Sequence, residues 1–196
     1  MTPISIEVFA AFHATFQGDT DDIFTICVAC GGTCETNLIA PLLPGEAEFM
    51  ASKMNLPVKR FKDLYLDGIL VNGEVIDVIK CIERCQLLTD HCSCGVRTFK
   101  PVTCTLHPLY FERDGENWRW LVDTDCPLSQ APHTRHHFEH NGIQAVNALQ
   151  IERTWYECSY EIFKHYFDYA ALAKDRDMPV ARYKLYPFDE IFAYHY

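Results

Sequence analysis

Hydrophobic residues recur at helical spacing near both ends of this 196-residue chain. Near the start, apolar side chains follow intervals of three or four residues: Val8, Phe9, Phe12 and Phe16. This spacing predicts a helix from Ile4 to Phe16, although the alternation of the first few residues would also suit a strand. A longer stripe of the same spacing, from Ile143 to Phe167, predicts a helix over residues 142–174, the longest element that we expect.

Local turn and capping signals predict the elements between these helices. Pro44-Gly45, with two carboxylates in the next turn, predicts a helix from about Gly45 to Asn55. Asn72-Gly73 lies between apolar runs and predicts a β-hairpin from Tyr65 to Lys80.

Further signals predict a second hairpin and irregular structure elsewhere. Asp114-Gly115 predicts a hairpin from Leu109 to Val122. The polar run 17–22 predicts a loop, and Ile23 to Ile26 predicts a short extended segment that leads into the first cysteines. Residues 178–196 carry two prolines and six aromatics, which predicts an irregular tail packed on the core.

Length and patterning favour one α+β domain over residues 1–196, with small antiparallel β-hairpins, a Cys-rich core and a long C-terminal helix packed on it. No stretch offers the roughly 18 apolar residues of a membrane span, and the start carries no leader pattern, so we expect a cytoplasmic protein. The formal charge of −10 argues against nucleic acid or an anionic membrane as partner. No protein partner can be read from the sequence.

The ten cysteines give the first indication of chemistry. They make up about 5% of the chain, below the density of a disulfide scaffold, and thiols in a reducing cytosol remain available as ligands. Three of them are concentrated in Cys27-Val28-Ala29-Cys30-Gly31-Gly32-Thr33-Cys34, where two glycines allow tight bending around a bound ion.

The later cysteines extend this pattern. Cys85 opens a Cys-x-x-Leu segment, Cys94 lies ten residues before Cys104, Pro101 begins a Pro-x-x-Cys, and Cys126 precedes Pro127. Together with the first group, this ordered set resembles the CxxCxxCC cysteine-cluster family of putative zinc- or iron-chelating proteins.

The resemblance covers residues 24–127 and implies metal chelation by seven cysteines: Cys27, Cys30, Cys34, Cys85, Cys94, Cys104 and Cys126. The chain departs from the family pattern at three positions. Thr33 replaces one cysteine of an adjacent pair, His107 replaces an aromatic residue and Lys100 replaces an arginine. Other groups near the set are additional candidate ligands for the missing thiolate: His107, His91, Cys81 and Cys92.

Elementary chemistry also favours a metal, because converging thiolates repel one another unless a soft cation neutralises them. Zinc, iron or an iron–sulfur cluster would satisfy these ligands equally well. Two alternatives stay open for the same thiols: packing as small hydrophobes, which is favoured for Cys158 on the last helix, and disulfides. Glu35, Glu46 and Glu48 could orient ligands, or the last two could simply stabilise a helix start.

A histidine-rich stretch allows a competing function. Residues His136, Glu139 and His140 form His-x-x-Glu-His, the pattern of an inverted zinc peptidase, in which two imidazoles hold zinc and the carboxylate acts as base. Asn141-Gly142 would interrupt the helix that this site needs. A second metal site without catalysis, or a solvated helix start, are the other interpretations of the stretch from His133.

The sequence thus predicts a metal-binding protein that holds zinc or iron, without deciding whether it is an enzyme. Redox chemistry or methyl transfer at an iron–sulfur or metal site is the alternative. Flagellin lysine methylases have a similar cysteine motif, but this chain has no glycine-rich nucleotide loop. A binding module whose aromatic tail, Tyr183 to Tyr196, covers a partner is a third class.

Overall fold

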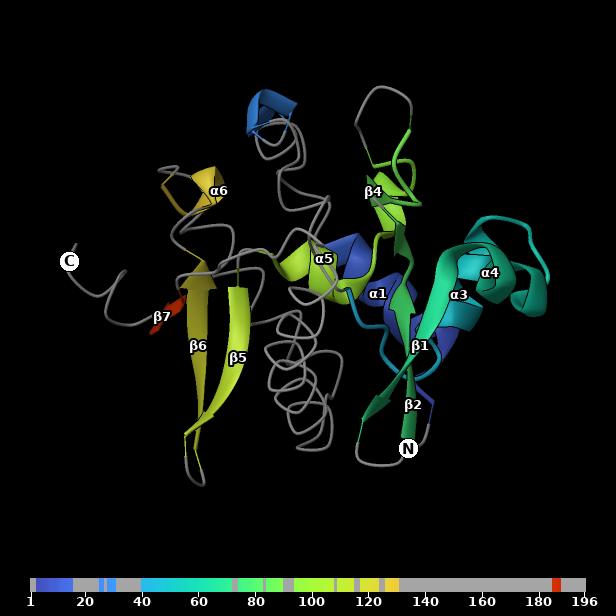
Figure 1. Ribbon diagram of the computed structural model, residues 1–196, viewed down its shortest axis with the longest axis horizontal. Helices are drawn as coiled ribbons and strands as arrows, with labels where there is room; N and C mark the ends of the chain where they lie inside the picture. Colours follow the sequence, from blue (N-terminus) through green and yellow to red (C-terminus); the bar gives the residue numbers. More distant parts are fainter. Residues whose placement is uncertain are drawn as a thin grey trace.

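The computed structural model describes the chain in segments: residues 3–15, 25–26, 28–30, 40–71, 74–82, 84–89, 94–107, 109–114, 117–123, 126–130 and 185–187. These segments contain helices and antiparallel strands (Figure 1). The predicted long helix over residues 142–174 and the loop at residues 17–22 lie outside the described residues, so the predicted fold class and single domain remain predictions.

The N-terminal helix α1 (Ile6–Thr15) packs on α3 (Glu46–Lys53). The apolar spacing correctly predicted α1, because Phe9 and Phe12 are buried in the core. Gly45 precedes α3 with a φ of 91°, and a Cβ there would lie 2.3 Å from the carbonyl oxygen of Ile4. Only glycine combines this left-handed conformation with such a close approach, so Gly45 lets the N-terminal segment cross the start of α3.

The end of α3 is a Schellman motif. Asn55 has a φ of 53°, the N–H of Leu56 donates to the Ala51 carbonyl (3.0 Å), and the N–H of Asn55 donates to the Ser52 carbonyl (3.2 Å). The prediction of a helix over Gly45 to Asn55 is therefore confirmed, with Gly45 as the N-cap and Asn55 as the left-handed residue that follows the C-cap Met54.

Helix α4 (Val58–Tyr65) follows directly and was not predicted from the sequence. Its buried residue Phe61 is fully enclosed, while Lys59 and Arg60 beside it are exposed. Val58, Phe61 and Tyr65 recur at helical spacing and all contact the core, so the sequence does carry an amphipathic signal for this helix.

The first predicted hairpin is confirmed. Strand β1 (Leu66–Val71) pairs antiparallel with β2 (Glu74–Ile79), and Val71 opposite Glu74 leaves the predicted Asn72-Gly73 as a two-residue connection. At the open end of this hairpin the N–H of Lys80 donates to the Tyr65 carbonyl (2.7 Å). On the other side of β2, Pro41 forms a bridge with Val78, so residues 40–42 extend the pairing.

The second predicted hairpin is also confirmed, with its turn one residue later than expected. Strand β5 (Leu109–Asp114) pairs with β6 (Asn117–Asp123), and Asp114 lies opposite Asn117. A third strand, β7 (Leu185–Pro187), pairs with β6. The tail was predicted to be irregular, and this is wrong for these three residues because β6 offers them an edge for backbone hydrogen bonds.

Short elements connect the two hairpins. They are β3 (Cys81–Ile82), β4 (Arg84–Cys85), the 3-10 helix η3 (Arg97–Phe99) and α5 (Val102–Leu106), with α6 (Pro127–Gln130) after β6. Figure 1 shows α1, α3, α4 and the β1–β2 hairpin toward one end of the long axis, the β5–β6–β7 sheet and α6 toward the other, and α5 between them. The described core includes side chains from α1, α3, α4 and α5.

Candidate metal centre

Five of the seven predicted cysteine ligands lie in described residues: Cys30, Cys85, Cys94, Cys104 and Cys126. The additional candidates Cys81 and His107 are described as well. Cys27, Cys34, His91 and Cys92 lie outside the described residues. All six described cysteines are half-buried, which is the exposure expected of thiols at the edge of a core.

The first cysteine group differs from the prediction in its local backbone. Residues 25–26 and 28–30 are helical, so the predicted extended segment ending at Ile26 is wrong there. Cys30 therefore lies at the end of a helical stretch instead of in a loop after a strand. The run Ile23 to Ile26 is too short for its alternation to distinguish strand from helix, which explains the error.

Cys81 and Cys85 lie directly opposite each other. They are paired residues of the β3–β4 ladder, in which facing Cα atoms are about 4.5–5.5 Å apart. The N–H of Gln86 donates to the Lys80 carbonyl (3.1 Å) and closes this small loop. The structure thus brings a cysteine of the family pattern together with one that the pattern does not include.

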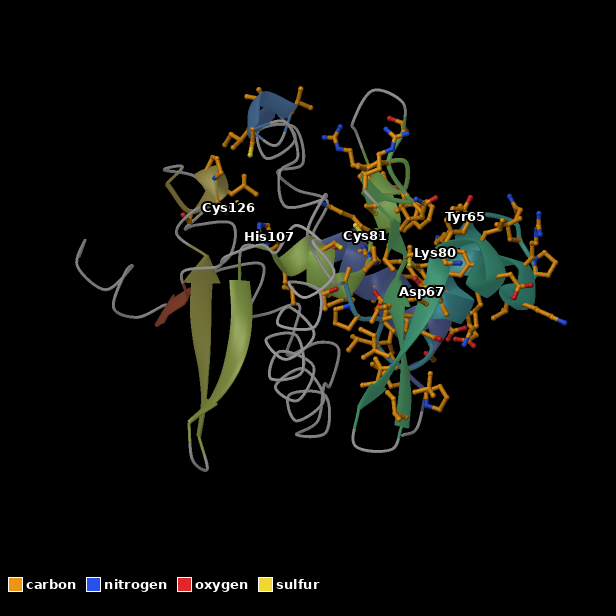
Figure 2. All side chains as sticks on the ribbon, in the orientation of Figure 1. Tyr65, Asp67, Lys80, Cys81, His107 and Cys126 are labelled. Carbon is orange, nitrogen blue, oxygen red and sulfur yellow. The ribbon has the colours of Figure 1, made fainter. Side chains whose placement is uncertain are left out.

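Lys80 holds the chain where it enters this loop. Its Nζ donates to the Asp63 carbonyl (3.1 Å) and lies 3.7 Å from Asp67 Oδ1, so it fastens the first residue before Cys81 to α4 and β1 (Figure 2). Burial raises the pKa of the Cys81 thiol. Ionising this thiol would therefore require a compensating positive charge close to the sulfur, which a bound cation supplies.

The chain between Cys85 and Cys94 turns back on itself. The N–H of Leu88 donates to the Cys85 carbonyl (3.2 Å), and Leu88 forms a bridge with Cys94. The N–H of Gly95 then donates to the Leu87 carbonyl (2.8 Å). These bonds return Cys94 to the neighbourhood of the residues just after Cys85, and both cysteines pack against the hydrophobic core.

Helix α5 carries Cys104 and ends at His107. Pro101 precedes the helix, where its missing N–H costs no hydrogen bond, and the N–H of His107 donates to the Thr103 carbonyl (3.1 Å). Cys104 is half-buried against the core, whereas His107 is only 7% exposed. Burial, with a smaller effect from the charge of Lys100, lowers the pKa of His107 to about 4. The imidazole is therefore neutral at pH 7, the form that binds metals.

A buried carboxylate fixes the start of α5. Glu46 is fully buried, and its two oxygens accept hydrogen bonds from the N–H of Leu43 (2.8 Å) and from the N–H of Val102 (2.6 Å). Burial raises the pKa of Glu46 to about 7, while the two hydrogen bonds act in the opposite direction. Glu48, the other carboxylate in the first turn of α3, is exposed. Sequence analysis assigns the same candidate roles to Glu46 and Glu48, but in the structure only Glu46 is buried.

Cys126 lies at the start of α6. Its carbonyl accepts hydrogen bonds from the N–H (3.0 Å) and the hydroxyl (2.8 Å) of Ser129, which form the first turn after Pro127. Figure 2 shows Cys126 beside α6 and His107 beside α5, with Cys81 farther along the molecule toward the β1–β2 hairpin. The described candidate ligands therefore come from separate elements.

The described candidates do not make a complete site by themselves. Within the segments that the structure describes, no three histidine, cysteine or acidic side chains are close enough together to hold one metal ion. Four of the eleven candidates are outside those segments. The structure adds three contacts to the cysteine pattern. Cys81 pairs with Cys85, Cys94 forms a bridge with Leu88, and Glu46 accepts a hydrogen bond from the first residue of α5.

Other candidate residues fall outside the described residues. These are Glu35, the His136, Glu139 and His140 motif, and Cys158. Of the aromatic tail, only residues 185–187 are described.

The chain matches no protein-family model, no curated protein and no solved structure. In the described part of the chain, no helix has the length and apolar character needed to cross a bilayer.

Proposed function

We propose that this protein binds zinc or iron through its cysteines and that the metal joins chain segments that are distant in the sequence. The observation that carries the proposal is that Cys81 lies opposite Cys85 while Cys94 forms a bridge with Leu88, three residues after Cys85. The ordered cysteine spacing from Cys27 to Cys126 supports it independently.

The half-buried thiols have the chemistry that a soft cation requires. Buried thiolates without a cation are unfavourable, and the raised pKa of Cys81 expresses this cost. A bound zinc or iron ion would neutralise several thiolates at once, and a closed four-ligand site would add directly to folding stability. His107 would supply a neutral nitrogen ligand in place of the family cysteine at Thr33. A reducing compartment such as the cytoplasm would keep the thiols available.

Elemental analysis of anaerobically purified protein, combined with its optical spectrum, tests the proposal. A stoichiometric metal is the expected result. Colourless protein with one or two zinc ions would indicate closed thiolate sites, whereas brown protein with iron and sulfide would indicate a cluster. Folded protein that contains neither metal, and takes up neither when it is supplied, would contradict the proposal.

A further inference from the structure

Glu46 is a fully buried carboxylate that contacts a cysteine-bearing segment 56 residues away in the sequence. Its two oxygens accept one backbone N–H from the turn before α3 and one from the first residue of α5. A buried carboxylate is unfavourable unless its oxygens accept hydrogen bonds. Both oxygens of Glu46 do so, and the two bonds hold the start of α3 and the start of α5 together.

This contact is one of several that hold helix α5, whose Val102 and Leu106 are also buried in the core. The helix has five residues, too few for internal hydrogen bonds to hold it in place, and the N–H of Val102 has no acceptor within its own helix. Glu46 accepts that N–H, and the hydroxyl of Thr103 donates to the Pro41 carbonyl (3.1 Å). Two consecutive residues thus tie the helix to residues 40–46, and the next residue is Cys104.

The segment that receives these bonds is itself firmly held. The N–H of Leu42 donates to the Asp77 carbonyl (2.9 Å) and the N–H of Ile79 donates to the Ala40 carbonyl (2.9 Å), so residues 40–42 are paired with β2. Gly45 lies against the backbone of Ile4, whose N–H donates to the Pro44 carbonyl (2.8 Å), so the N-terminal segment also contacts these residues. Glu46 therefore connects α5 to a rigid part of the molecule, and Cys34 precedes that part by only six residues.

We propose that Glu46 is a positioning residue of the metal site, whose carboxylate fixes α5 so that Cys104 is presented to the metal. The proposal rests on the proposed metal-binding function and names a residue that the cysteine pattern does not contain. Groups that orient metal ligands typically change affinity by about 10–100-fold when they are removed. The same size of effect is expected here.

The test compares Glu46→Gln with Glu48→Gln, which makes the same chemical change two residues away on an exposed position of α3. Glutamine keeps the shape of Glu46 but turns an amide NH2 toward one of the two backbone N–H donors, so one bond is lost. We expect Glu46→Gln to bind zinc about 10–100-fold more weakly in competition with a chromophoric chelator. Glu48→Gln should bind as the wild type does.

Cobalt(II) gives a second readout that a general loss of stability would not change. Thiolate ligands produce charge-transfer absorption with cobalt, so loss of Cys104 from the site lowers this band per bound metal. Glu46→Gln should lower it, and Cys104→Ser should lower it to the same level. In the Cys104→Ser background, Glu46→Gln should have no further effect on zinc affinity, since coupled residues are non-additive.

The remaining outcomes distinguish a wrong role for Glu46 from a wrong proposed function. If Glu46→Gln binds zinc like the wild type, or weakens binding equally when Cys104 is absent, the inference is wrong while the proposed function stands. If the wild type takes up none of zinc, cobalt and iron, the proposed function itself is wrong, and if it takes up iron alone, the same variants are compared by their iron content. If Glu46→Gln does not fold, as judged by circular dichroism, Thr103→Val decides the question. It removes the second tether and should weaken zinc binding only when Cys104 is present.

Discussion

Residues 40–66, here called the packed region, and residues 81–107, the cysteine region, adjoin the same hydrophobic core but are held in different ways. The first region has two full helices and encloses Phe49, Met50 and Phe61 completely. The described residues of the second region form two-residue strands, a 3-10 turn and a five-residue helix, and the cysteines described there are half-buried. The second region also contributes fully buried side chains, Val102 and Leu106, so the two regions differ in the length of their elements and in their half-buried thiols. We infer that the second region needs a cross-link that the first does not.

The largest effect should come from the packed region. Phe49 is fully buried, stacks on Phe9 (5.5 Å between ring centroids) and lies parallel to the His13 ring. Phe49→Ala should lower the free energy of unfolding by about 3–5 kcal/mol, with or without metal, as measured by urea denaturation. Leu70→Ala, at a position 66% exposed, should change it by less than about 0.5 kcal/mol. Equal effects of Phe49→Ala and Leu70→Ala on the free energy of unfolding would contradict the claim that burial at Phe49 stabilises the fold.

The packed region should also respond to pH through Glu46. Its pKa is raised to about 7 in the folded protein, above the ordinary value of 4.5 in the unfolded chain. The folded state therefore holds the proton more tightly, and this contribution to stability is complete below pH 4.5 and lost as the pH rises through about 7. Glu46→Gln should remove the dependence, so the difference in unfolding free energy between wild type and variant should change by about 3 kcal/mol between pH 4.5 and 8.

His13 provides the contrasting titration in the same experiment on metal-free protein. Burial, then the charges of Lys53 and Lys100, lower the pKa of His13 from 6.5 to about 4. The folded protein thus prefers the neutral ring, and this contribution is present above pH 6.5 and lost as the pH falls toward 4. His13→Phe should reduce the loss of stability in acid and leave the change near pH 7 intact. A wild-type profile that is unaltered by both variants would contradict both assignments.

The cysteine region should respond to metal more than to packing changes. Cys85→Ala is expected to weaken zinc binding by about 100-fold or more, equivalent to about 3 kcal/mol, because a ligand matters at least as much as the groups that orient it. In the presence of a chelator, the same variant should differ from wild type by no more than about 1 kcal/mol. The same two measurements, zinc affinity and stability in chelator, are made on Cys81→Ala, which removes the facing thiol on β3. Unchanged zinc affinity in Cys85→Ala would exclude that thiol from the site.

The smallest effect concerns the ion pair between Lys62 of α4 and Asp77 of β2, whose side chains are 41% and 32% exposed. The 2.6 Å pair raises the pKa of Lys62 through its hydrogen bond to Asp77. Lys62→Met should lower stability by about 0.2–1 kcal/mol, because partly exposed pairs are screened by water. The difference in unfolding free energy between wild type and Lys62→Met should shrink in about 1 M salt, which screens charges. A difference that does not depend on salt would point to packing of the Lys62 side chain instead.

Local patterns predicted the elements that local interactions form. The three- and four-residue spacing of Phe9 and Phe12 predicted α1, and Asn72-Gly73 predicted the first hairpin, because period and turn chemistry depend on neighbouring residues. Helix α4 was missed although Val58, Phe61 and Tyr65 follow helical spacing, because its eight residues are shorter than the window over which periodicity is judged. The helical residues before Cys30 and the strand at residues 185–187 were predicted wrongly, since short segments take their structure from their surroundings.

Non-local contacts explain what the sequence could not reveal about the candidate site. The bond between Glu46 and Val102 joins residues that share no motif, and Glu48 would have been an equal candidate by any local criterion. The pairing of Cys81 with Cys85 depends on a turn that their four-residue separation allows but does not require. The cysteine spacing predicts a metal-binding region, which stays a prediction, and the described contacts show which residues hold the start of α5 in place.

Hydrogen exchange with and without a chelator tests the central claim most directly. The amides of Gln86, Leu88 and Gly95 are hydrogen-bonded within the cysteine region, whereas that of Met54 is bonded within the packed one. If metal holds the cysteine region, chelation should sharply increase exchange at the first three amides and leave Met54 protected. Exchange that is unaffected by chelation at all four amides would contradict the account.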